Sequence, residues 1–246
     1  MVNREELKNY CNTYLDIGKF KDYCPNGLQI EGSLNITKIV SGVSANLELI
    51  ERAIEEKADA IFVHHGVFWD NESKTISGAK RAKIALLLKH NINLFGFHLP
   101  LDDHDEVGNN VELGRRLGIK NMEPVAGGLL WQGELNTNIS DFSKLIEEKL
   151  DRAPQVFGKQ SGKIKKISWC TGAAQGFIED AINLNVDLYL SGEVSEKTPA
   201  VAKENNITFI SAGHHATERY GVQALCKHLC SQFKLQHHYI EVDNSV

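Results

Sequence analysis

Two adjacent histidines, His64 and His65, end the apolar run AIFV that begins at Ala60. Imidazole nitrogen is a common ligand for zinc, manganese and iron. Neighbouring residues of a β-strand point to opposite faces, so one face of a strand would not present both rings. Where the chain turns at the end of a strand, however, both rings can enter one cavity and point to different places within it. Two metal ions a few ångströms apart would use such a divergence.

Two further segments place imidazole and carboxylate side chains where an apolar run ends. The first, FHLPLDDHDE, contains His98 and Asp102. In the second, SAGHHATERYG, His214 and Glu218 are four residues apart, so on the first turn of a helix they share one face. A single strand-end histidine is commonly a hydrogen-bonded structural residue. Three such groups together favour a metal site with nitrogen and oxygen donors, suited to zinc, manganese or iron.

The elements that must position these side chains alternate between amphipathic helices and short apolar strands. This alternation predicts an α/β protein with mostly parallel sheets, in which ligands bind at the carboxyl ends of the strands. Helices are predicted at residues 3–17, 46–57, 77–90, 106–117, 140–150, 174–185, 197–205 and 216–232. Strands are predicted at residues 37–43, 59–64, 92–98, 129–136, 164–170, 186–191, 207–212 and 237–242.

The chain contains a faint internal repeat. Ile39–His65 resembles Ile167–Glu193 in its order of strand, turn, amphipathic helix, aspartate and apolar strand, and a further helix and strand follow each copy. One sequence does not distinguish a duplication from two ordinary βαβ units. In either case we predict two similar α/β lobes, residues 1–122 and 123–246, with loop chemistry at Met122–Gly128 and the metal site in the cleft between the lobes.

Composition limits the classes of function. The 246 residues are 42% hydrophobic and 24% charged, as in ordinary globular proteins, and the formal net charge of −5 argues against a general nucleic-acid binder. The N-terminus, MVNREELKNY, is too polar for a signal peptide, and no apolar window is long enough to span a membrane. The five cysteines form no CxxC pair, which predicts reduced thiols in a cytoplasmic protein.

Several motifs occur in the order typical of one family. They are PNGLQIEG, SGV, HHGVFW, HLPLD, SGEVSE and GHHATE, and in this order they resemble the Ngg-interacting-factor-three-like proteins, also called the GTP cyclohydrolase I type 2 family. The resemblance covers nearly the whole chain. It implies a dinuclear metal centre between two α/β domains, on subunits assembled into a ring-shaped homohexamer. The metal ligands that it implies are His64, His65, Asp102, His214 and Glu218.

Five protein ligands for two divalent metal ions (zinc, manganese or iron) leave coordination positions open, as a catalytic site requires. The resemblance implies that GTP is hydrolysed to dihydroneopterin triphosphate and formate by attack of a metal-bound hydroxide. His98 is the first candidate for the general acid or base, and Glu193, which aligns with His65, is the second. Alternatively, His98 orients a metal ligand and Glu193 has a structural or surface role. Asn26 and Gly27 are predicted to form a turn.

Two other classes of function share the same ligands. One is a metallohydrolase that acts on a phosphoester or an amide, and the other is a non-catalytic metal-binding ring that serves as a scaffold. The chain has no P-loop for a triphosphate, and Arg219 either meets a phosphate or lies at the surface. We expect a small-molecule substrate, with a nucleotide as one candidate, and neither a membrane nor a nucleic-acid partner. A nucleic acid would be favoured only if the assembly gathered Lys163, Lys165 and Lys166 around a pore.

Overall fold

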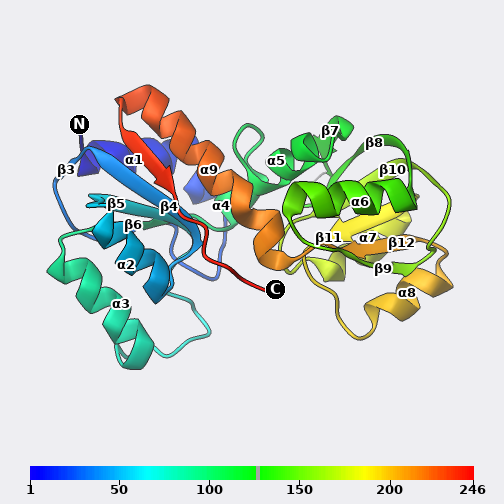
Figure 1. Cartoon of the computed structure of the whole chain (residues 1–246), viewed down its shortest axis with the longest axis horizontal. Coiled ribbons are helices and arrows are strands. Elements are labelled where there is room, and N and C mark those ends of the chain that lie inside the picture. The colour runs from blue at the N-terminus through cyan, green and yellow to red at the C-terminus, as the bar shows by residue number, and fades with distance from the viewer. Residues whose placement is uncertain (126–127) are drawn as a thin grey trace. The chain divides into compact units, whose positions relative to one another are not determined.

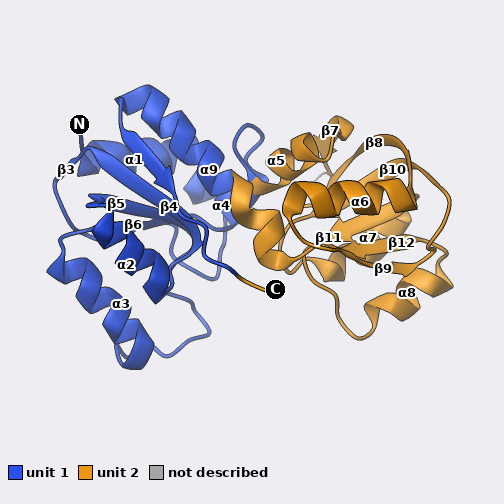
Figure 2. Cartoon of the chain, in the orientation of Figure 1, with its two compact units in different colours: residues 1–108, 221–243 blue, residues 109–220, 244–246 orange. Residues whose placement is uncertain are grey.

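The computed structural model describes residues 1–125 and 128–246, which form two compact units (Figure 1, Figure 2). Unit 1 contains residues 1–108 and 221–243, and unit 2 contains residues 109–220 and 244–246. Each unit is built of helices and a β-sheet, so the α/β class is confirmed. The units differ in extent from the predicted lobes, because the chain leaves unit 1 before residue 122 and returns to it at residue 221.

The elements follow in chain order. Unit 1 begins with β1 (Val2–Asn3), α1 (Arg4–Tyr14), η1 (Ile17–Lys19), β2 (Gly27–Ile30), β3 (Asn35–Ile36), β4 (Lys38–Ser44), α2 (Leu47–Glu55), β5 (Ala60–His65), α3 (Gly78–Lys89), β6 (Asn93–Gly96) and α4 (Leu99–Asp103). Unit 2 contains α5 (Asn109–Arg116), β7 (Lys120–Pro124), β8 (Trp131–Asn138), α6 (Ile139–Leu150), β9 (Gln155–Gly158), β10 (Lys163–Cys170), η2 (Gln175–Phe177), α7 (Ile178–Asn183), β11 (Leu188–Ser191), α8 (Thr198–Glu204) and β12 (Thr208–Ser211). Helix α9 (His214–Phe233) begins in unit 2 and continues into unit 1, which β13 (Gln236–Tyr239) completes.

The sheet of unit 1 has the strand order β13-β4-β5-β6-β2. The first four strands are parallel, and β2 runs antiparallel to β6. Strand β5 is central, and its side chains alternate between two cores: Phe62 packs in one, whereas Ile61 and Val63 pack in the other. A strand covered on both faces reads as a continuous apolar run, which explains the sequence AIFV before the two histidines.

The sheet of unit 2 has the order β7-β8-β10-β11-β12-β9, in which only β10, β11 and β12 are mutually parallel. The prediction of a mostly parallel sheet is therefore wrong for this unit, because β7, β8 and β9 pair antiparallel. A parallel pair needs a long crossover connection, and the six residues between β7 and β8 are too few for one. Met122, predicted to lie in a loop, lies in β7, and residues 126–127 of that predicted loop lie outside the described residues.

The two units share one arrangement, which corresponds to the internal repeat. In unit 1 the order is β4-α2-β5-α3-β6, and in unit 2 it is β10-α7-β11-α8-β12. In both, the three strands are parallel neighbours in sequential order. The repeat in the sequence therefore corresponds to two βαβαβ segments of the same topology.

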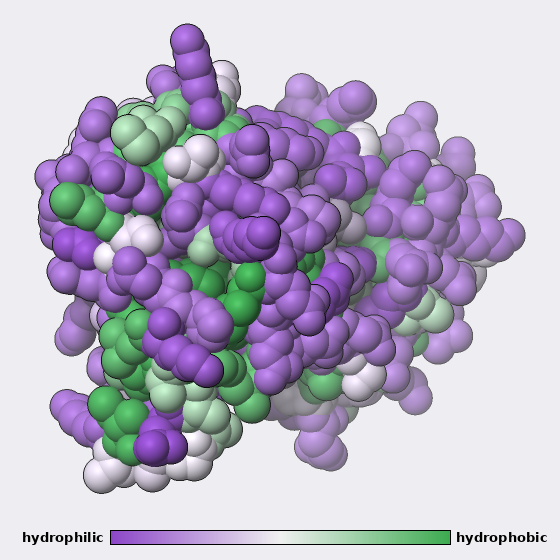
Figure 3. Space-filling model, turned by 60° about the vertical axis from the view of Figure 1, so that its left-hand side comes forward, coloured by the Kyte–Doolittle hydropathy of each residue, from purple (hydrophilic) through white to green (hydrophobic). Residues whose placement is uncertain are grey.

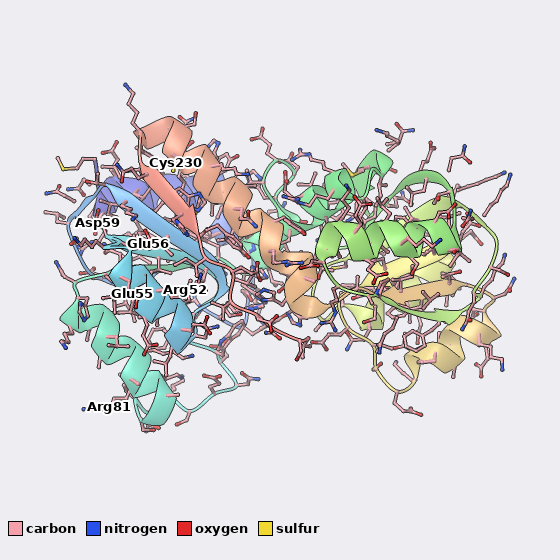
Figure 4. All side chains as sticks on the ribbon, in the orientation of Figure 1. Arg52, Glu55, Glu56, Asp59, Arg81 and Cys230 are labelled. Atoms are coloured by element: carbon pink, nitrogen blue, oxygen red, sulfur yellow. The ribbon has the colours of Figure 1, made fainter. Side chains whose placement is uncertain are left out.

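An aspartate fixes the start of the central strand in each copy. Asp59, labelled in Figure 4, precedes β5, and its Oδ2 accepts hydrogen bonds of 2.7 and 2.9 Å from the backbone N–H groups of Thr37 and Lys38. Asp187 precedes β11, and its Oδ2 accepts bonds of 2.8 and 3.0 Å from two consecutive backbone N–H groups of β10. Each carboxylate thus satisfies two backbone donors and holds two neighbouring strands in register.

Hydrophilic side chains cover most of the face of the molecule that Figure 3 presents, and apolar side chains appear there in a few separate areas. Large hydrophobic side chains that are exposed in unit 1 include Ile76 and Leu88. Nowhere in residues 1–125 or 128–246 is there a helix with the length and apolar content needed to cross a lipid bilayer.

We predict that Asp59→Ala and Asp187→Ala each lower the free energy of unfolding by about 1–3 kcal/mol, because each leaves two backbone donors without their charged acceptor. Chemical denaturation monitored by circular dichroism would measure this loss. Glu55→Ala, at an exposed position of α2, is the control and should have little effect. Equal stability of Asp59→Ala and the control would show that the carboxylate does not hold the strands.

Candidate metal centre

Strand β5 places His64 and His65 at the carboxyl end of the central strand of unit 1. The Nδ1 of His64 lies 2.8 Å from the carbonyl oxygen of Phe97, just after β6. The Nδ1 of His65 lies 3.0 Å from Oγ of Ser44, at the end of β4. Because β4 and β6 flank β5 on opposite sides, the two rings are held from opposite directions. The ring planes differ by 45°, while the ring centroids lie 4.6 Å apart.

The hydrogen bond to Phe97 determines which nitrogen of His64 could bind a metal ion. A carbonyl oxygen only accepts hydrogen bonds, so Nδ1 carries the proton, and Nε2 is the nitrogen suited to a metal. This Nε2 lies 3.4 Å from Oδ1 of Asp102 on α4. His64 and Asp102 are only 1% and 6% exposed. A buried carboxylate oxygen beside an imidazole nitrogen offers a divalent cation two ligand atoms of suitable type.

His98 lies close to this pair. Its ring centroid is 5.0 Å from that of His64 and 5.8 Å from that of His65. Each of the three histidines offers a ring nitrogen, and these nitrogens all lie within 4.8 Å of one another. The structure therefore brings the first candidate acid or base together with two of the predicted metal ligands.

Asp22, which no sequence motif singled out, holds His98 in place. Its Oδ1 lies 2.9 Å from Nδ1 of His98, and its Oδ2 accepts bonds from the side chain of Asn26 at 2.9 Å and from the backbone N–H of Leu99 at 3.0 Å. Burial alone would raise the pKa of Asp22. The hydrogen bonds from His98 and Asn26 lower it by more than burial raises it, so that the pKa is about 2. Asp22 is therefore ionised at neutral pH and favours a proton on Nδ1 of His98.

Asn26 has a larger role than the predicted turn. Besides donating to Asp22, its Oδ1 accepts a 2.7 Å hydrogen bond from the backbone N–H of His98. The amide side chain thus connects the segment before β2 to the end of β6. A signal for this network is present in the sequence, since Asp22 and Asn26 are four residues apart, directly beside a recognised motif.

In unit 2, the first turns of α9 place His214 and Glu218 on one helix face, as their spacing predicts. Nε2 of His214 lies 3.1 Å from Oε2 of Glu218, and its Nδ1 lies 2.6 Å from Oε1 of Glu193. Burial alone would lower the pKa of His214. The hydrogen bonds and charges of Glu218 and Glu193 raise it by more than burial lowers it, so that the pKa is about 9. An imidazole between two carboxylates is a place that attracts positive charge, whether a proton or a metal ion.

A glycine makes room for Glu218. Gly172 has a positive φ of +66°, and a Cβ at this position would overlap Oε1 of Glu218 and lie 3.4 Å from Nε2 of His214. Any other residue would therefore displace the carboxylate. The side chain of Glu218 is 4% exposed, so it has little freedom to move aside.

Two further residues of α9 donate hydrogen bonds to backbone carbonyl oxygens. Arg219 donates a hydrogen bond to the carbonyl oxygen of Leu150, at the end of α6, which favours a structural role. The backbone N–H of His215 donates to the carbonyl oxygen of Val246 at 3.0 Å, and the residue is buried.

The five predicted ligands form two groups, each well defined within its own unit. His64, His65 and Asp102 belong to unit 1, and His214 and Glu218 belong to unit 2. That all five bind one pair of metal ions stays a prediction.

These features define a class of protein: an α/β chain of two units, each with imidazole and carboxylate side chains that follow parallel strands. The Duf34/NIF3 family (NGG1p interacting factor 3) matches residues 2–245, and the chain belongs to this family.

Relatives share nearly their full length with this chain. A protein of Allochromatium vinosum named GTP cyclohydrolase 1 type 2 homolog is 48% identical and covers 99% of this chain and 98% of its own. A Pseudomonas aeruginosa protein of the same name is 46% identical and covers 97% of this chain and 96% of its own. Among solved structures, protein ybgI, described as of unknown function, matches with a TM-score of 0.95 and 40% identity over 100% of both chains. TTHA1606 from Thermus thermophilus matches with a TM-score of 0.90 and 30% identity, also over 100% of both.

We predict that Asp22→Asn lowers the free energy of unfolding at pH 7 by about 1–2 kcal/mol. The pKa of Asp22 is lowered from 3.8 to about 2, so its carboxylate stabilises the fold above about pH 4. This stabilisation is lost as the pH falls through about 2. Unfolding measured between pH 7 and pH 2 should therefore depend less on pH in the variant. Asp105→Asn, at an exposed position, is the control and should keep the wild-type slope.

We predict that Gly172→Ala lowers both stability and metal binding, because its Cβ would displace Glu218. Gly118→Ala is a matched control, since Gly118 has a similar φ of +71° but no atom within 4 Å of the added Cβ. The control measures the backbone strain of about 1–2 kcal/mol, and the additional loss in Gly172→Ala measures the clash. Thermal unfolding and metal titration of both variants would test this, and identical behaviour of the two would contradict the argument.

Proposed function

We propose that the protein is a dinuclear metal-dependent hydrolase. In this proposal His64, His65, Asp102, His214 and Glu218 bind two divalent ions of zinc, manganese or iron. The observation that carries it is the group of His64, His65 and His98, whose ring nitrogens lie within 4.8 Å of one another at the end of β5 and β6. The carboxylates on α4 and α9 add oxygen donors, and this set without thiolate is suited to a catalytic rather than a structural metal site.

When bound, such ions supply Lewis acidity that polarises the substrate and activates water. The chain itself supplies the proton transfer. Nδ1 of His98 is engaged by Asp22, so Nε2 is the nitrogen that would exchange a proton with the substrate. We assign Glu193 to the orientation of His214 rather than to proton transfer, because its carboxylate lies 2.6 Å from Nδ1 of that ring.

The substrate that relatives suggest is GTP, since the curated proteins at 46–48% identity are named GTP cyclohydrolase 1 type 2 homolog. Two waters would cleave the two C–N bonds of purine C8, which leaves as formate. One water would be released when the freed amine condenses with the carbonyl of the rearranged ribose to give dihydroneopterin triphosphate, so the net reaction consumes one water. The attacked carbon resembles an amidine and loses two C–N bonds, a step that Lewis-acid activation and a proton donor would both assist. The ring-shaped homohexamer that the resemblance implies remains part of this proposal.

We predict about two metal ions per chain in purified protein, and a sharp decrease in His65→Ala, because this ring supplies one ligand nitrogen. Elemental analysis after dialysis would measure the content. His90→Ala is the control, since His90 is exposed at the end of α3. An unchanged metal content in His65→Ala would contradict the proposed ligand set.

The reaction is tested by incubating metal-loaded protein with GTP and measuring formate. Formate production that is lost in His65→Ala would support the proposed reaction. Turnover of a phosphoester or an amide without release of formate would show that the substrate belongs to another class than GTP. Bound metal without turnover of any substrate in a broad panel would favour the non-catalytic scaffold and overturn the proposal.

A further inference from the structure

A pocket of about 530 Å³ lies within unit 1, a size typical of small-molecule sites. It is lined by Asp22, Cys24, Pro25, Phe68, Trp69, Asp70, Ser73, Lys74 and Lys80. These residues come from the segment that leads into β2, from the segment between β5 and α3, and, for Lys80, from the first turn of α3. Both segments adjoin motifs of the sequence, but neither contributes a predicted metal ligand from within the pocket.

The pocket adjoins the histidines of the candidate metal centre. Asp22 lines the pocket and also bonds Nδ1 of His98. The ring centroid of Trp69, another lining residue, lies 5.2 Å from that of His98 and 5.8 Å from that of His65. A molecule bound in the pocket would therefore be next to the proposed proton donor and next to a proposed metal ligand.

Aromatic side chains provide an apolar wall. Phe68 and Trp69 are both partly buried, and Pro25 adds a further apolar surface. Two neighbouring rings hold Trp69 in place. The ring of Tyr23 stacks with it at a centroid distance of 6.5 Å, and the ring of His98 packs edge-on against it. A held indole ring offers a flat surface for stacking of a planar ring, at a low cost in conformational entropy.

Two lysines provide positive charge. The side chain of Lys80 is only 16% exposed, and its Nζ lies 3.1 Å from Oε2 of Glu72 and 3.1 Å from the carbonyl oxygen of Ser73. Lys74 lies in the same segment and is exposed. Glu72 offsets part of the charge of Lys80. The ammonium group has three N–H donors, and the contacts with Glu72 and Ser73 use two, so the third can be donated to a phosphate oxygen.

Of the two carboxylates that line the pocket, that of Asp22 is already engaged within the protein. The two oxygens of Asp22 already accept four hydrogen bonds, from the side chains of His98 and Asn26 and the backbone N–H groups of Tyr23 and Leu99. Asp70 is exposed and lines the same pocket, where its carboxylate could accept hydrogen bonds from the N–H groups of a polar ring.

We infer that this pocket binds an aromatic compound that carries a phosphate group, with its ring against Trp69 and Phe68 and its phosphate at Lys74 and Lys80. The inference rests on the proposed function in one respect: the reacting atom of such a compound would face His98. Trp69 and Lys80 would then determine which substrates the hydrolase accepts.

The test uses the metal-free full-length chain and guanosine 5′-monophosphate as the probe. The other two tryptophans of the protein, Trp131 and Trp169, lie buried in unit 2, so quenching of the fluorescence of Trp69 would report on the pocket. We expect the nucleotide to quench this fluorescence, and guanosine to bind about tenfold more weakly. Ribose 5-phosphate and inorganic phosphate should bind more weakly still, because they lack the ring.

Variants separate the two contacts. Trp69→Leu should weaken binding of both the nucleotide and guanosine in calorimetry, whereas Lys80→Ala should weaken only the nucleotide, by about tenfold, and Lys80→Arg should restore it. Lys89→Ala, on the same helix but outside the pocket, is the matched control. Nucleotide binding that is absent from the wild type, or equal in Trp69→Leu, Lys80→Ala and the control, would overturn the inference.

The outcome is distinguishable from failure of the proposed function. Because binding is measured without metal, it does not depend on whether the chain binds metal ions or releases formate. Nucleotide binding that persists in a protein without metal or formate production would support the pocket and reject the hydrolase.

Discussion

The end of a buried parallel strand is the feature on which the candidate site depends. Strand β5 has strands on both sides and hydrophobic cores on both faces, so its last residues are fixed in position. Its two histidines make hydrogen bonds through Nδ1 with groups on opposite neighbouring strands, Phe97 and Ser44. Both rings are thereby oriented, and for His64 the backbone carbonyl of Phe97 determines that Nε2 is the nitrogen suited to a metal. Such preorganisation is what allows a metal to be bound without a large entropic cost.

The two units use one βαβαβ arrangement to hold different chemistry. Asp59 and Asp187 make equivalent hydrogen bonds to the preceding strand, so the scaffold is the same in both copies. At the end of β5 stands His65, whereas Glu193 follows β11 at the aligned position and contacts His214. The scaffold therefore fixes where a polar side chain is presented, and the residue type determines whether it would bind a metal or orient a ligand.

Helix α9 has two functions along its length. Its first turns carry His214 and Glu218 in unit 2, where Gly172 leaves space for the carboxylate. Its later residues, among them Val222 and Leu225, pack in the core of unit 1. One helix thus carries two of the proposed ligands in one unit and core residues in the other.

The sequence by itself determined the eight longer helices and eight strands that were predicted, since apolar periodicity records which face of each element is buried. It also determined the pairing of His214 with Glu218, because a helical spacing of four residues is a local property. The short strands β1, β2, β3, β7 and β9, helix α4 and the contacts of Asp22 were not predicted, and they depend on the fold as a whole. A short half-exposed strand has little periodicity, and the bond from Asp22 to His98 joins residues 76 positions apart, which only the folding of the chain brings together.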